Sequence, residues 1–227
     1  ATPTDADLDA ASRLANRLLS ASESALAINS HAAIIWATRG VALSRLATLG
    51  IDGAAEQARS AYDRAVLLEP ANPEWPYRAA LGLSGLGDKA VVAGYLDRAI
   101  TISPNHAPAH LLGVRLLEES GNWPLAEGEW RVLTRLDPTN FTNWFGLGVS
   151  RYRQNNFTGA LNALAQTLAL NPDYANARYF LALVYDELGR DDEAIRELEV
   201  ITAVNPDRAD LPEMIARLRS GQSALVK

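Results

Sequence analysis

The sequence predicts an all-α fold, a right-handed solenoid of stacked helix pairs, and two observations carry this prediction. First, a proline recurs every 34 residues, at Pro70, Pro104, Pro138, Pro172 and Pro206. Second, alanine and leucine dominate the composition while β-branched and aromatic clusters are few, which favours helix over sheet. A repeat of this length with helical periodicity indicates helix–turn–helix units that stack on one another, and we expect about twelve helices.

The first elements are less regular than the rest. Residues 5–28 carry apolar side chains at helical spacing and are expected to form one helix, the second half of a repeat whose first half is absent. This half-repeat, and the lack of a start signal, suggest that the native chain extends upstream of Ala1. Residues 33–72 form a repeat with six extra residues, which lengthen its first helix or the turn around 49–53.

Four regular repeats follow, counted so that the recurring proline is position 32. Position 15, in the turn between the two helices, holds a residue that tolerates a left-handed φ. Positions 20, 24, 27 and 30 hold mainly small or apolar residues on one face of the second helix. The repeats are residues 73–106, 107–140, 141–174 and 175–208; position 15 is Gly87, Gly121, Asn155 and Gly189.

The last element is an amphipathic helix over residues 209–221, expected to cap the array with a polar outer face. Its inward face holds Leu211, Met214, Ile215 and Leu218. The tail after it is expected to fray. Taken together, residues 1–227 are predicted to form a single domain.

Each recurring proline is expected to end one repeat. Proline cannot continue the helical hydrogen bonding and biases the residue before it toward an extended conformation. Residues after it, such as Asn105 and Asp173, can then cap the next helix. The 34-residue period and these positional preferences resemble tetratricopeptide repeats, a family of helix–turn–helix solenoids.

Composition excludes several classes of function. The net charge of −6 and the pI near 5.1 argue against binding of nucleic acid or of anionic membranes. Cysteine is absent, which excludes disulfides, thiolate metal sites and cysteine catalysis. No run of 18 or more apolar residues occurs, so no membrane insertion by this chain is expected.

No motif predicts catalysis, a metal or a cofactor. Residues 5–9 alternate aspartates but lack the glycine and glutamate of a calcium loop, and the glycines of residues 146–151 lack the third glycine and the strand of a dinucleotide site. His106 and His110 stand four apart without a third ligand, so they are interpreted as an adventitious pair. We therefore predict a protein that is not an enzyme.

The expected binding surface is the groove lined by the first helix of each repeat. Tyrosine and arginine are favoured binding anchors, but Tyr77, Phe145 and Tyr179 could equally pack against neighbouring repeats. Of the tryptophans, Trp75 and Trp123 are expected to be partly exposed. The candidate groove residues are Tyr77, Leu81, Leu111, Arg115, Glu118, Phe145, Val149, Tyr152, Arg153, Tyr179, Leu183 and Asp186.

In chaperone-binding tetratricopeptide proteins, the family resemblance implies a clamp of lysine, asparagine and arginine around a C-terminal carboxylate. This chain has no lysine at the candidate groove positions. A co-chaperone role of that kind is therefore not expected.

Three segments, residues 48–73, 171–195 and 205–225, carry a second resemblance. They are similar to the C-terminal repeat region of large bacterial polytopic membrane proteins related to O-antigen ligases and polymerases. The resemblance implies a soluble appendage tethered to a bacterial membrane through an upstream region, with no catalytic residue in this chain. The compartment itself is not predicted.

Three functions stay open. The first is a non-catalytic module that binds a peptide or protein segment in the groove. The second is a structural spacer or oligomerisation element whose groove is filled by its own or a neighbouring chain. The third is recognition of a glycan by groove aromatics, in support of an enzyme domain upstream.

Overall fold

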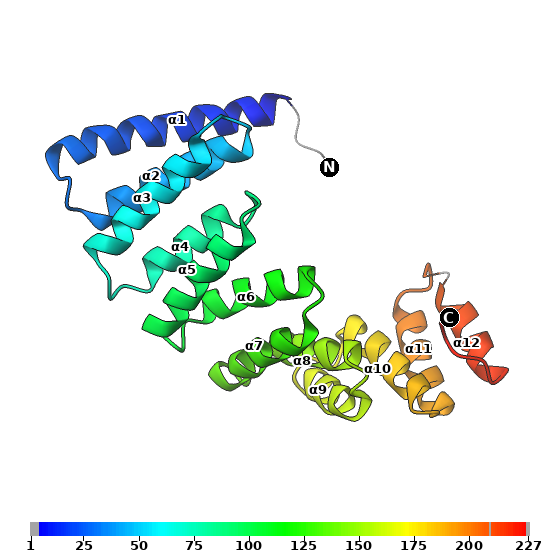
Figure 1. Ribbon diagram of the computed structural model, residues 1–227. Helices are drawn as coiled ribbons and strands as arrows, with labels where there is room; N and C mark the ends of the chain where they lie inside the picture. The colour runs from blue at the N-terminus through cyan, green and yellow to red at the C-terminus, as the bar shows by residue number, and fades with distance from the viewer. Residues whose placement is uncertain (1–4, 209, 226–227) are drawn as a thin grey trace. The chain divides into compact units, whose positions relative to one another are not determined.

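The computed structural model describes residues 5–208 and 210–225, with side chains from residue 8 onward, and this part of the chain forms twelve helices and no strand (Figure 1). The predicted all-α fold is confirmed. The chain divides into two compact units, Ala1–Leu112 and Gly113–Lys227, and each is described by itself. The first unit holds α1 (Asp5–Ile28), α2 (Ala33–Thr48), α3 (Ala54–Leu68), α4 (Glu74–Leu83) and α5 (Lys89–Ile102).

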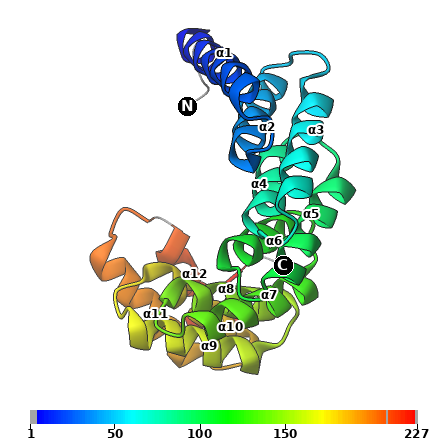
Figure 2. The same ribbon diagram turned by 90° about the vertical axis from the view of Figure 1, so that its left-hand side faces the viewer.

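The division falls within α6 (Ala107–Glu119). The second unit continues with α7 (Trp123–Leu136), α8 (Phe141–Arg153), α9 (Phe157–Leu170), α10 (Ala175–Glu187), α11 (Asp191–Val204) and α12 (Asp210–Arg219). Within each unit, consecutive helices pack as hairpins, α2 with α3 and α4 with α5 in the first, α8 with α9 and α10 with α11 in the second (Figure 2).

Small residues let the two helices of each hairpin approach closely. At position 20, Ala126, Ala160 and Ala194 are fully buried, and positions 24 and 27 are buried in all four regular repeats. The prediction is wrong at position 30, because Leu170 and Val204 are exposed. These residues are the last of their helices, where the buried stripe has already rotated past them.

The turn inside each regular repeat has the left-handed backbone that position 15 predicts. The φ angles are 99° at Gly87, 71° at Gly121, 59° at Asn155 and 68° at Gly189. Asn155 is the one non-glycine residue with positive φ in the described part of the chain. Asparagine is among the few side chains that adopt this conformation without a large steric penalty.

The proline junctions have the predicted backbone in part. The residue before each proline leaves the helical region, with φ between −139° at Asn171 and −132° at Asn205, but only Ser103 and Asn171 are extended. The expected cap at Asp173 is wrong, since the residue at the start of α10 is Tyr174 and no side chain caps that end. At the Pro104 junction, where Asn105 is the expected cap, His106 acts instead, because its Nδ1 accepts a hydrogen bond from the Ala109 N–H at 3.1 Å.

A second bond recurs at these junctions and was not predicted. The side chain at position 4 of a repeat bonds to the main-chain oxygen six residues earlier, at the proline position or its equivalent. The pairs are Trp36 Nε1 with the Ser30 oxygen (2.9 Å), His110 Nε2 with Pro104 (2.9 Å), Trp144 Nε1 with Pro138 (2.9 Å) and an Arg178 NH group with Pro172 (2.8 Å). Tryptophan, histidine and arginine serve because each presents an N–H at the end of a long, flat side chain.

The six extra residues of the irregular repeat are shared between helices and turn. α2 has 16 residues where α6, α8 and α10 have 13, and α3 has 15 where α5, α7, α9 and α11 have 14. The remaining two lengthen the turn over residues 49–53, which contains Gly50 and Gly53 at positive φ. The next first helix, α4, is instead short, with 10 residues.

The C-terminal helix packs as predicted, but the described part of the tail after it packs on the fold, contrary to the expected fraying. The inward residues of α12, from Leu211 to Leu218, are buried in the core with Leu198 and Ile201 of α11. Ala224 in the tail is only 2% exposed and joins the same core. Of the residues that sequence analysis assigned to the capping helix and tail, Ala209 and residues 226–227 lie outside those described.

Candidate ligand-binding faces of the two units

In the second unit, the predicted groove aromatics form one continuous cluster. Phe145 on α8 meets Tyr174 edge-on at 5.0 Å between ring centroids, and also Phe180 on α10 at 5.7 Å. Tyr152 on α8 contacts Phe180 at 5.7 Å, and Tyr179 contacts Phe180 at 6.0 Å. Sequence analysis missed Phe180, which stands at position 6 and joins the others. The rings are half-buried, so they both pack between repeats and present part of their surface.

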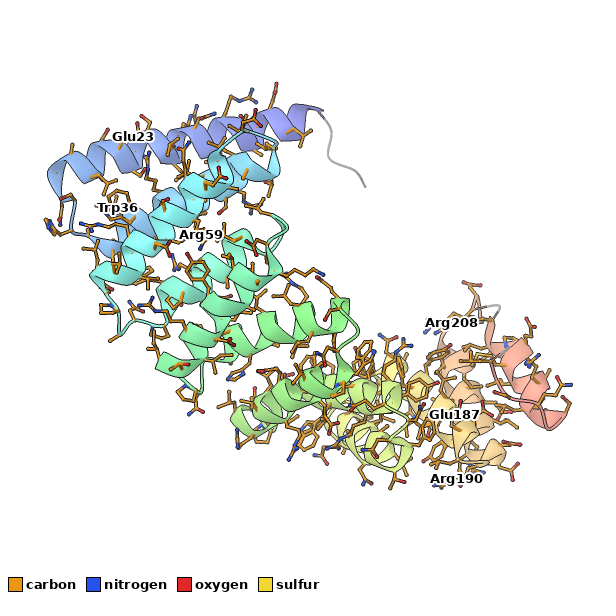
Figure 3. All side chains as sticks on the ribbon, viewed as in Figure 1. Glu23, Trp36, Arg59, Glu187, Arg190 and Arg208 are labelled. Carbon is orange, nitrogen blue, oxygen red and sulfur yellow. The ribbon has the colours of Figure 1, made fainter. Side chains whose placement is uncertain are left out.

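Charged groups surround the hydroxyl end of this cluster. Burial raises the pKa of the Tyr152 hydroxyl, and the negative charge of Glu187 adds to the effect while Arg153 opposes it. The Arg208 guanidinium lies over the Tyr179 ring, 5.0 Å from its centroid, and pairs with Asp210 at 2.5 Å. Glu187 and Arg208 are labelled in Figure 3. An aromatic surface flanked by both signs of charge suits a polypeptide better than a purely apolar or ionic ligand.

Two predicted groove residues on α10 have structural roles. Leu183 is 4% exposed and packs in the core against the last helices, so its assignment to the groove is corrected. Position 9 of this repeat turns inward because α12 covers it. Asp186 is bonded to the tail, since its Oδ2 accepts from Ser223 Oγ at 2.8 Å and from the Ala224 N–H at 3.0 Å.

The remaining candidates in the second unit differ in exposure. Arg153 is exposed and lies over the Trp123 ring at 5.6 Å. Arg115 is exposed and lies 3.9 Å from Glu119, a weak surface pair. Glu118 accepts a hydrogen bond from Trp130 Nε1 at 2.9 Å, which fixes the indole inside the hairpin, and Val149 is half-buried.

In the first unit, the predicted residues do not form one cluster. Tyr77 stacks on His106 at 5.1 Å between centroids, and the His106 Nε2 lies 3.6 Å from Glu74. Leu81 and Leu111 are exposed, at 44% and 46%. Trp75 is 6% exposed, contrary to expectation, because its indole N–H donates to Glu69 Oε2 at 2.8 Å and its ring packs in the core of the hairpin stack.

None of the described helices is both long and apolar enough to span a lipid bilayer. Within the described residues, no three histidine, aspartate or glutamate side chains gather as a metal site would require. His106 and His110 have separate partners, as given above.

Comparison with known proteins gives the architecture its name. Residues 151–218 match the family model described as tetratricopeptide repeat. This segment, within the second unit, is similar to the tetratricopeptide family. The tetratricopeptide protein YrrB superposes with a TM-score of 0.66 at 18% identity, over 83% of this chain and 94% of YrrB. MamA from Desulfovibrio magneticus RS-1 gives 0.59 at 17% identity, over 75% and 98% of the two chains. At these identities the likeness is one of fold.

One curated protein, from Homo sapiens, is similar to part of the chain. Protein O-mannosyl-transferase TMTC3 is 24% identical over 155 residues, which make up 66% of this chain and 17% of the relative. The chain therefore spans less than a fifth of that protein's length.

Proposed function

We propose that the chain is a non-catalytic interaction module in which first helices of the tetratricopeptide repeats bind a peptide or protein segment. Proteins of this fold typically mediate protein–protein contacts, and YrrB is described as having an unusual peptide-binding site. The observation that carries the proposal for this chain is the aromatic cluster of α8 and α10. Its rings are held by one another and still present an edge to solvent.

Such rings are effective anchors. A tyrosine already fixed by its neighbours loses little conformational freedom when a ligand covers it, while it offers a large contact area and a hydroxyl. Tyr179 is the ring chosen for the test, because it combines a half-buried ring with the hydrogen-bond donors of the Arg208 guanidinium beside it. Tyr152 lies beside it, near the charges of Glu187 and Arg153.

The test is selection of binders from a phage-displayed library of random peptides on the whole chain, followed by affinity measurement on alanine variants. Tyr179→Ala is expected to weaken the selected peptides at least about tenfold, as loss of a binding hot spot does. Tyr185→Ala is the matched control: it lies on the same helix, is half-buried and is covered by Arg190 at 4.6 Å. Tyr185 is six residues after Tyr179, so its side chain is rotated by roughly 240° around the helix axis relative to that of Tyr179. Equal loss in both variants, or in neither, contradicts recognition by this face.

The proposed setting is an appendage of a membrane glycan-assembly protein. The resemblance of residues 48–73, 171–195 and 205–225 to the repeat region of proteins related to O-antigen ligases supports it. A distant likeness to a relative named as an O-mannosyl-transferase, most of which lies outside the match, adds weak support. Sequencing of the gene upstream of Ala1 is the test: membrane-spanning segments are expected, and an open reading frame that encodes none would contradict this setting.

One observation favours the alternative role of a structural spacer. Asp186, a predicted groove residue, is occupied by the chain's own tail through Ser223 and Ala224. A spacer would select no peptides in the experiment above. Glycan recognition would change the tryptophan emission when the chain is titrated with oligosaccharide. An unchanged emission spectrum would contradict the glycan-binding alternative.

A further inference from the structure

A cavity of about 340 Å³ opens in the first unit between α2 and α4. It forms where the long helix α2 packs beside the short helix α4. Two glycines shape this cavity. Gly82 lets the Tyr62 hydroxyl approach the backbone of α4, because a Cβ at Gly82 would collide with it, and Gly85, just after α4, faces open space. The lining residues are Val41, Ser44, Arg45, Thr48, Tyr62, Arg78, Leu81, Gly82 and Gly85. We refer to it as the Tyr62 cavity.

Two buried hydroxyls belong to the lining of the Tyr62 cavity. Ser44 Oγ and the Tyr62 hydroxyl lie 3.3 Å apart, and either can be the donor. Their residues are 5% and 0% exposed. Since one proton suffices for the bond between them, the other O–H is available to an acceptor supplied by a ligand.

Two guanidinium groups lie beside these hydroxyls. Burial raises the pKa of Tyr62, and the hydrogen bond from Ser44 and the positive charges of Arg78 and Arg45 oppose that shift, so both cations act on the phenol oxygen. Arg78 pairs with Glu74 at 2.6 Å. Arg45 is exposed and forms no ion pair with any residue that the structure describes.

The lining of the Tyr62 cavity therefore carries hydrogen-bond donors and positive charge. No described aspartate or glutamate lines the Tyr62 cavity, although the chain as a whole carries a net charge of −6. Hydrogen-bond donors and positive charge converge on the space, which is the complement of a carboxylate. At the rim, Val41 and Leu81 are 36% and 44% exposed and offer apolar surface. A small inorganic anion would leave that surface uncovered.

We propose that the Tyr62 cavity binds the side-chain carboxylate of an acidic residue in a peptide, with an adjacent apolar residue of the same peptide against Val41 and Leu81. Arg45 supplies the positive charge and the Ser44–Tyr62 pair supplies the buried donor. The inference rests on the proposed peptide-binding function and names the class of peptide: an acidic residue next to an apolar one.

The experiment extends the peptide selection to the Arg45→Gln variant of the whole chain. Among the peptides selected by the unmodified chain, those whose binding Tyr179→Ala leaves unchanged are expected to be enriched in aspartate or glutamate beside an apolar residue, and selection on Arg45→Gln is expected to lose this group. A selected peptide, synthesised with blocked ends, is expected to weaken at least tenfold when its acid is changed to the amide. Arg64→Gln is the matched control, because it removes an exposed cation of α3 that does not line the cavity.

A second variant closes the cavity without touching its charges. Gly85→Leu places a side chain into open space at the rim, where the backbone φ is not positive, so the fold is expected to survive. Gly85→Leu should lower the affinity for the acidic peptide as Arg45→Gln does. An unchanged thermal melt, followed by circular dichroism, checks that the variant is folded.

The outcomes separate the two proposals. If no peptide is selected, the interaction function itself fails. If peptides are selected without acidic residues, or with acids to which Arg45→Gln and Gly85→Leu are indifferent, the carboxylate site alone is overturned. Two further results would also overturn the side-chain carboxylate as the ligand. One is binding that depends on the free C-terminal carboxylate of the peptide, and the other is loss of peptide binding in millimolar inorganic phosphate.

Discussion

Asp186 holds Ser223 from the far end of the chain: its carboxylate accepts the serine hydroxyl at 2.8 Å, 37 residues along the sequence. The same oxygen accepts the N–H of Ala224, whose side chain is buried in the core. One carboxylate thus ties the tail to the end of α10.

The Asp186→Ala variant is expected to unfold more easily by about 1–3 kcal/mol, the usual range for hydrogen bonds to a charged group. Urea unfolding measures the loss, and amide hydrogen exchange at Ala224 should accelerate. Asp207→Ala, at an exposed position before α12, is the control and should change neither. Unchanged exchange in Asp186→Ala would contradict the role of this contact.

The close packing of α8 on α9 predicts that a larger residue at Gly148 destabilises the chain. A Cβ at Gly148 would lie 2.7 Å from Leu164 Cγ, so Gly148→Ala should cost about 1–3 kcal/mol through overpacking. Gly128→Ala, on the open side of α7, should instead stabilise the chain by about 0.5–1 kcal/mol, because alanine favours helix. Thermal melts of the two variants should therefore move in opposite directions. A shared direction would refute the packing argument.

The left-handed turn at Asn155 gives a third prediction. Asn155→Ala should destabilise the chain by about 1 kcal/mol, since a Cβ without a local polar group is disfavoured at φ 59°. Asn155→Gly should be neutral or stabilising, as the three other repeats have glycine there. The control Asn162→Ala, exposed on α9, removes an asparagine without touching a turn. Chemical unfolding of the three variants tests the order.

Glu69 gives a pH dependence of stability. Hydrogen bonds from Asn72 and from Trp75 lower the pKa of its carboxyl below the usual 4.5. A carboxyl whose folded pKa is lowered stabilises the fold fully above its unfolded pKa, and this contribution is lost as the pH falls through the folded value. Glu69→Gln should therefore differ most from the unmodified chain at neutral pH. The urea midpoints of the two should converge in acid; a constant gap across this window would argue against it.

The repeat frame was predictable from sequence because it follows from local rules. The residue before each proline and the residue in each inner turn have backbones set by steric constraints that act over two or three positions. Asn155 was placed correctly among three glycines for this reason. The same reasoning locates the first helices that carry Tyr152 and Tyr179.

The parts that sequence analysis missed depend on contacts between distant segments. Leu183 is in the core because α12 covers it, and the tail is ordered because Asp186 binds it. Trp75 is buried by its bond to Glu69, a residue of the preceding repeat. The Tyr62 cavity arises from the unequal lengths of α2 and α4, and no motif encodes such a difference.

The bond from position 4 to the main-chain oxygen of the preceding junction bears on the addition or loss of whole repeats. Where the bond is present, donor and acceptor are six residues apart across the junction, as in Trp144 with Pro138 and Arg178 with Pro172; the repeat that starts at residue 73 lacks a donor, because its position 4 is Pro76. Duplication of a 34-residue unit that begins with one of the donors His110, Trp144 or Arg178 at position 4 restores this bond at the new seam. The array can therefore gain such a repeat and keep this bond between neighbouring units.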